Sequence, residues 1–146
     1  MTEKLNKLEA AFKESLKAAL HNIDSEKIDE TLDNRDLPEF SDAWMEAYHA
    51  IDEKKVEEEI EDKITDIRKE IFVTIFRITE STELPAYISD DFELVSSYYL
   101  HDIENKWVTN LLFTYLNHRI PQGNLLIQTD KTMKELLQGN APFFSE

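Results

Sequence analysis

A long stripe of apolar residues, spaced for one face of a helix, runs through the middle of the chain. Its members are Trp44, Tyr48, Ile51, Val56, Ile60, Ile64, Ile67, Ile71, Ile75 and Ile78. They follow one another in steps of three and four, with a single step of five between Ile51 and Val56. Because such spacing places side chains on one side of an α-helix, we predict a long helix from Ser41, with a kink or short loop at 52–55.

The composition along this helix changes from charged to apolar. Up to about Lys63 the stripe is flanked by glutamates, whereas Phe72, Val73 and Phe76 flank it beyond Ile71. A helix that is apolar on most sides is usually buried on most sides. We therefore expect the second half of this helix to pass through the centre of the domain. The alternative is a strand at 70–79, because that segment is rich in β-branched and aromatic residues.

The remaining apolar patterns also favour helices. They predict one helix over 2–23, a short one after Asp24, one from Ser89 to 116 with a break near His101, and a last one over 131–138. Ser89 would cap its helix, with Asp90 and Asp91 in the first turn. Since two glycines and four prolines leave few turn-formers, we predict an all-α fold. The chain (1–146) should form a single compact helical domain of about five helices around a long central helix.

The formal net charge of −15 is unevenly distributed. Residues 24–62 contain 16 acids and 4 bases, a net −12, and residues 80–105 contain 7 acids and no base, a net −7. This charge repels phosphates and anionic lipids and attracts basic surfaces. The sequence therefore argues against nucleic acid and membrane as partners and favours a basic protein. The charged amino terminus and the lack of a long apolar segment predict a soluble, cytoplasmic protein.

Few residues are arranged for catalysis or metal binding. Glu46 and His49 have the Glu-x-x-His spacing of di-iron sites, but the sequence lacks the second copy that such sites need. His101, with Asp102 and Glu104, could form an acid–base pair, although a histidine at a helix break more often bonds the local backbone. There is no cysteine and no glycine-rich phosphate loop. We predict a protein that is not an enzyme and needs no cofactor or metal.

The acidic segment at 24–62 is more suggestive of recognition. Its carboxylates alternate with Leu37, Phe40, Trp44, Met45 and Tyr48, residue types that anchor protein interfaces. Trp44 and Tyr48 lie on the helical stripe and are expected in the core, whereas Met45 lies off it and is expected to be exposed. The predicted partner-binding residues are Asp42, Met45, Glu46, Glu53, Glu57, Glu58, Glu61 and Asp62.

These observations favour a non-enzymatic, acidic binding protein of the immunity or antitoxin type, which covers a basic protein partner. The simplest competing interpretation is that the acids only keep the protein soluble. A second alternative is a structural domain that forms homo-oligomers through apolar surface such as Phe143 and Phe144.

Overall fold

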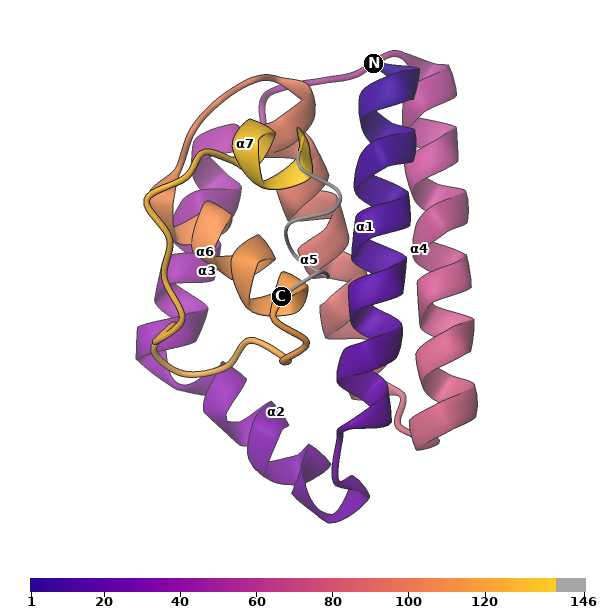
Figure 1. Cartoon of the computed structure of the whole chain (residues 1–146), viewed down its shortest axis with the longest axis vertical. Helices are drawn as coiled ribbons and strands as arrows, with labels where there is room; N and C mark the ends of the chain where they lie inside the picture. Colours follow the sequence, from indigo (N-terminus) through magenta and orange to yellow (C-terminus); the bar gives the residue numbers. More distant parts are fainter. Residues whose placement is uncertain (139–146) are drawn as a thin grey trace.

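The computed structural model describes residues 1–138, which form an all-α bundle (Figure 1). The elements are α1 (Thr2–His21), the 3-10 helix η1 (Ser25–Lys27), α2 (Ile28–Asp36), α3 (Pro38–Ile51), α4 (Glu58–Thr79), α5 (Glu83–Leu100), α6 (Lys106–Leu116) and α7 (Met133–Gln138). The predicted all-α fold is confirmed, and these residues contain no strand. The alternative of a strand at 70–79 is wrong, because that segment forms the last turns of α4. Phe143 and Phe144 lie outside the described residues.

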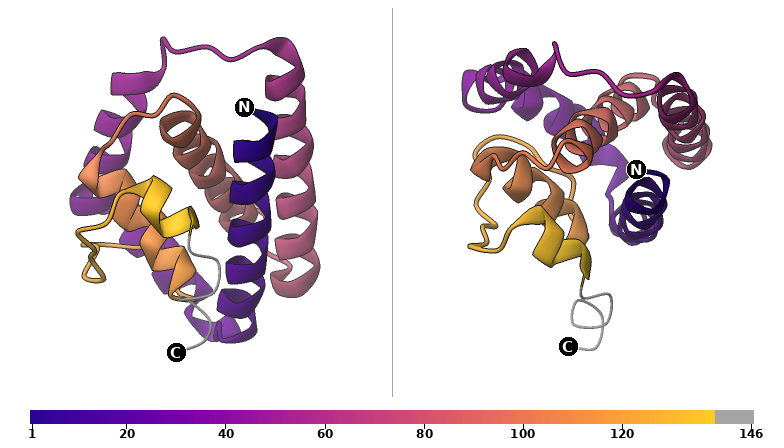
Figure 2. Two further views of the ribbon diagram at one scale, coloured as in Figure 1. Left: turned by 45° about the horizontal axis from the view of Figure 1, so that its top comes forward. Right: turned by 90° about the horizontal axis from the view of Figure 1, so that it is seen from above.

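The central helix of the bundle is α5. It packs against α1, α2, α3, α4 and α6, and most of its side chains are buried. Helices α1 and α4 lie side by side on one flank of the molecule, and α3 lies on the opposite flank (Figure 2). None of the helices in the described part of the chain is long and apolar enough to cross a membrane.

The expected burial of the second half of α4 is wrong. Helix α4 buries a single stripe, made of Ile60, Ile64, Ile67, Ile71 and Ile75. Its other apolar side chains face outward, and Val73, Phe76 and Ile78 are 43%, 42% and 53% exposed. The reason is that α4 lies at the edge of the bundle and packs mainly on α5 and α1. Val73, Phe76 and Ile78 therefore remain largely exposed.

The two predicted breaks in the helical pattern, at 52–55 and near His101, are both true helix ends. Each divides one expected helix into two, so there are more helices than the five expected. Helix α3 ends at Ile51, before the segment 52–57, and α5 ends at Leu100, before the segment 101–105. The residues Glu80, Asp102 and His118 follow α4, α5 and α6 closely and have positive φ angles. Glycine usually takes this left-handed position, but the chain has only two glycines.

Helix α5 begins earlier than its capping pattern suggests. It starts at Glu83, and Pro85 lies in its first turn. Proline is tolerated there because N–H groups in the first turn have no partner within the helix. Ser89, Asp90 and Asp91 therefore lie within the helix, and the predicted capping role is wrong. The Ser89 hydroxyl donates to the carbonyl oxygen of Ala86 at 2.9 Å instead.

We predict that Ile75→Ala lowers the free energy of unfolding by about 2–5 kcal/mol, because it leaves a cavity in a tightly packed core. Ile75 is fully buried, whereas Val73 on the same helix is 43% exposed. Val73→Ala is the matched control and should change the free energy by less than about 0.5 kcal/mol. Urea titration followed by circular dichroism measures both. Equal losses would contradict the observed orientation of α4.

Candidate partner-binding surface

A buried ion pair joins α2 to α5. The Arg35 side chain is 4% exposed and that of Asp91 is fully buried. Nη2 of Arg35 donates to Oδ1 of Asp91 at 2.8 Å, and Nη1 donates to Oδ2 at 2.9 Å and to the carbonyl oxygen of Pro121 at 3.0 Å. Burial opposes the charge on Arg35, but the attraction of Asp91 outweighs it, so the pKa of the guanidinium is raised. The Arg35 guanidinium is therefore charged in the folded protein.

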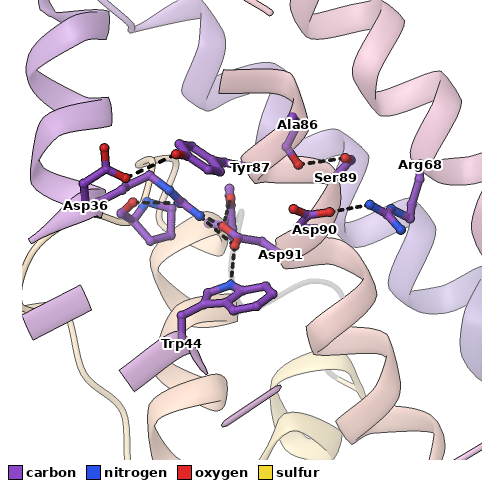
Figure 3. A network of polar contacts seen from close by, with 11 residues as sticks. Asp36, Trp44, Arg68, Ala86, Tyr87, Ser89, Asp90 and Asp91 are labelled. Atoms are coloured by element: carbon purple, nitrogen blue, oxygen red, sulfur yellow. Dashed lines mark hydrogen bonds and ion pairs between the residues drawn. The ribbon is translucent and has the colours of Figure 1, made fainter. Parts of the chain in front are cut away.

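Two further donors complete the coordination of Asp91. The indole Nε1 of Trp44, from α3, donates to Oδ1 at 2.9 Å, and the hydroxyl of Tyr115, from α6, donates to Oδ2 at 2.6 Å. Burial, with a further contribution from the charge of Asp91, raises the pKa of Tyr115 well above its ordinary value, so the phenol keeps the proton that it donates. One carboxylate thus holds side chains from α2, α3 and α6 against α5 (Figure 3).

Aromatic rings enclose the Arg35 side chain. Its guanidinium carbon lies 4.4 Å from the centre of the Phe40 ring and 5.3 Å from that of Tyr87. The Tyr87 hydroxyl in turn donates to Asp36 at 3.2 Å. Cations are attracted to the faces of aromatic rings, and arginine stacks on them especially well. These rings therefore form one wall of the cavity that opens beside the ion pair.

This first cavity, the aromatic cavity, has a volume of about 250 Å³ and lies between α2, α3 and α5. Its lining is largely apolar, and the acids Asp36 and Asp90 lie among the lining residues. The cavity is lined by Arg35, Asp36, Phe40, Ser41, Trp44, Met45, Tyr87 and Asp90. An apolar lining with carboxylates suits a ligand group that is apolar along its length and cationic at its tip.

A second cavity, the acidic cavity, has a volume of about 270 Å³ and lies between α3, α4 and α5. Asp52, Glu61, Asp90 and Glu93 contribute its carboxylates, and Lys54 and Lys55 are its lysines. Trp44 and Asp90 line both cavities. The two cavities therefore adjoin, and we call them together the α3–α4 groove, with α5 as its floor.

The floor of the groove is formed by half-buried side chains of α5. Asp90, Glu93 and Ser97 line the cavities, are half-buried and recur at helical spacing. Arg68, from α4, bonds Asp90 and also donates to Glu93 at 2.8 Å. Burial raises the pKa of Asp90 above its ordinary value, the attraction of Arg68 opposes this, and the neighbouring Asp91 and Glu93 add to the increase. The floor thus has more negative charge than the nearby arginines balance.

Two of the histidines, His101 and His49, were considered for acid–base chemistry and metal binding. The ring nitrogens of His101 lie 2.8 Å from the carbonyl oxygen of Ser97 and 3.2 Å from that of Lys55. His101 lines the acidic cavity, but Asp102 and Glu104 do not. The His49 side chain is 64% exposed, with Asp52 at 3.7 Å. Within residues 1–138, no three histidine or acidic side chains gather closely enough to hold a metal ion.

All eight of the residues predicted to bind a partner are exposed. Asp42, Met45 and Glu46 lie on α3, Glu53 and Glu57 lie in the segment that joins α3 to α4, and the other three lie at the start of α4. Two of the eight line the groove: Met45 the aromatic cavity and Glu61 the acidic cavity. The expected exposure of Met45 is confirmed at 44%, whereas Tyr48, expected in the core, is 38% exposed.

The predicted partner-binding residues did not include four acids that line the groove, namely Asp36, Asp52, Asp90 and Glu93. Asp90 and Glu93 belong to the second acidic segment, 80–105, whose net charge of −7 was the available signal. Their helical spacing would have placed them on one face. Nothing in the sequence indicates that this face lies beside the acidic part of α3.

A larger cavity, of about 800 Å³, lies between the ends of α1 and α6 and the segment 117–127. Its charged lining residues are Asp24, Lys27 and Arg119, together with His118. This mixed lining lacks the concentration of carboxylates that distinguishes the α3–α4 groove. We therefore regard the groove as the better candidate for recognition.

Comparison with known proteins identifies the family. The family described as "Immunity protein PIM1" matches residues 5–122, a range that includes both walls and the floor of the groove. The chain belongs to this family of immunity proteins. The predicted immunity-type function is confirmed at this level, and membership in the family points to a protein that binds rather than catalyses. Comparison with curated proteins found no match.

For this immunity protein, we predict that Asp91→Asn lowers the free energy of unfolding by about 3–5 kcal/mol, because it leaves Arg35 charged and buried without its partner. Asp90→Asn is the matched control. The Asp90 side chain is 46% exposed, and since its pKa is raised, its ionised form is less favoured in the folded than in the unfolded chain. This control should not lower stability appreciably. Urea unfolding at pH 7 measures both, and similar losses would contradict the central role of Asp91.

Proposed function

We propose that this immunity protein neutralises a basic toxin by covering part of its surface with the α3–α4 groove and the acids around it. The observation that carries the proposal is the position of the groove. Acids from both acidic segments, such as Asp36 from 24–62 and Asp90 from 80–105, line the same cavity. Two charge clusters that are separate in sequence thus act on one surface.

Charge would act mainly on the rate and specificity of association. The two acidic segments contribute −12 and −7 to a total of −15. Complementary charge steers a basic partner toward the groove and raises the association rate, especially at low salt. Exposed charge pairs alone contribute little to affinity, at most about 1 kcal/mol each. A tight complex therefore also needs apolar contacts.

The apolar contacts would come from side chains around the groove. Leu37, Met45 and Tyr48 are 43%, 44% and 38% exposed. Tyr48 stacks on Trp44, with ring centres 5.6 Å apart. Aromatic and methionine side chains are enriched in the desolvated centres of interfaces, and charged residues lie around them. The groove with its surrounding acids has this composition.

The proposal is tested with the cognate toxin, purified in an inactive form. A variant with amides in place of Asp42, Glu46, Glu53 and Glu61 should bind this toxin about 10- to 1000-fold more weakly, because each exposed contact contributes up to about 1 kcal/mol. Calorimetry measures the Kd at two salt concentrations. Co-expression with the active toxin should show a matching loss of protection.

The matched control has amides in place of Glu3, Glu14, Asp66 and Asp130, which are exposed acids that do not line the groove. The change in net charge is the same in both variants. An equal effect of the two variants would show that only total charge matters. A toxin that is not basic, or that binds without dependence on salt, would overturn the proposal.

A second candidate function is self-association, favoured by the outward-facing Val73, Phe76 and Ile78 of α4. Exposed apolar clusters often mark interfaces. If α4 mediates a homo-oligomer, sedimentation velocity should show a dimer or larger species that Phe76→Glu converts to monomer. Lys69→Glu, an exposed charge change on the same helix, is the control. A wild-type protein that remains monomeric at high concentration would exclude this function.

A further inference from the structure

The junction of the two cavities has the features of a specific subsite. Trp44, from α3, and Asp90, from α5, line both cavities. Trp44 is half-buried and fixed by its hydrogen bond to Asp91 at 2.9 Å. Asp90 is held from the side of α4 by Arg68. The two side chains that meet an incoming group are thus oriented before any partner binds, which lowers the entropic cost of binding.

The charges around the junction do not balance. The two cavities are lined by five acids (Asp36, Asp52, Glu61, Asp90 and Glu93) and three bases (Arg35, Lys54 and Lys55). With the paired Asp91 and Arg68 there are six negative and four positive charges, a difference of −2. Both arginines already bond carboxylates, Arg35 that of Asp91 and Arg68 those of Asp90 and Glu93. Burial is the main cause of the raised pKa of Asp90, and the like charges of Asp91 and Glu93 add to it. An added cation would relieve the excess of negative charge.

The size and lining of the aromatic cavity suit one side chain. Its volume of about 250 Å³ lies below the roughly 300–1,000 Å³ of most small-molecule sites. Met45 and Trp44 provide apolar surface, and Asp36 and Asp90 provide carboxylates. A long side chain with an apolar stem and a cationic head matches this arrangement.

We propose that the junction receives a single arginine side chain of the toxin, with its stem along Met45 and Trp44 and its guanidinium between Asp36 and Asp90. This inference rests on the proposed function. Arginine fits better than lysine because its planar, weakly hydrated guanidinium stacks on aromatic rings and bonds carboxylates in a forked geometry. The protein itself uses this chemistry one layer deeper, where Arg35 lies against Phe40 and Tyr87 and pairs with Asp91.

The first test uses small probes and does not require the toxin. The ¹⁵N-labelled protein is titrated with N-acetyl-arginine amide, N-acetyl-lysine amide and N-acetyl-norleucine amide, and the indole N–H of Trp44 and the backbone N–H of Asp90 are followed by NMR. Arginine amide should shift these signals saturably in the millimolar range. Lysine amide should bind at least threefold more weakly, and norleucine amide should cause no saturable shift.

Two variants locate the effect. Asp90→Asn should weaken binding of arginine amide at least tenfold, whereas Asp66→Asn, an exposed acid on the outer side of α4, should leave it unchanged. Asp36→Asn is a second junction variant, at an exposed position, and should also weaken binding. An unchanged spectrum away from the junction shows that each variant is folded.

The inference is overturned if lysine or norleucine amide binds as well as arginine amide, or if both junction variants bind like the wild type. The toxin complex then separates this inference from the proposed function. Asp90→Asn should raise the toxin Kd at least tenfold and Asp66→Asn should not. If the junction variants keep full toxin affinity while amides at the surrounding acids abolish it, the arginine subsite is wrong and the proposed function stands.

Discussion

The arrangement of the bundle around the groove depends on one buried carboxylate. Asp91 lies in the middle of the central helix and accepts hydrogen bonds from Arg35 of α2, Trp44 of α3 and Tyr115 of α6. A carboxylate without such partners would cost several kcal/mol to bury. Its four hydrogen bonds therefore restrict the helices to arrangements that bring all three donors together. The position of α3 beside α5, and with it the first wall of the groove, follows from that requirement.

The second wall depends on a different kind of interaction. Helix α4 is held by its isoleucine stripe, which buries Ile64, Ile67 and Ile71. Such contacts are strong but not directional. Arg68 adds direction, because it bonds Asp90 and Glu93 on the floor of the groove. Helices α3 and α4 thus contact α5 through two neighbouring acids. Asp91, which faces inward, bonds α3, and Asp90, which faces the groove, bonds α4.

The two neighbouring acids differ in burial and in how their charges are paired. Asp91 is fully buried and has all the partners that it needs, so it stabilises the fold and is inaccessible to a ligand. Asp90 is half-exposed, and burial raises its pKa, while Arg68 opposes the increase and the neighbouring Asp91 and Glu93 add to it. Incompletely compensated charge in a preformed groove is available to a partner.

The sequence alone determined the features that depend on the spacing of residues within one helix. The spacing of the isoleucines determined the inward face of α4, the low glycine and proline content favoured helices, and the position of Met45 off the stripe predicted its exposure. Predictions from local sequence patterns were wrong where contacts between residues distant in the sequence decide the structure. Ser89, Asp90 and Asp91 resemble a helix start, but a buried arginine 56 residues away makes Asp91 an interior residue. The outer face of α4 was expected to be buried because it is apolar. Apolar composition alone, however, does not show which helices cover a face. Only tertiary packing decided which carboxylates share a groove, since that depends on side chains that meet across helices rather than along them.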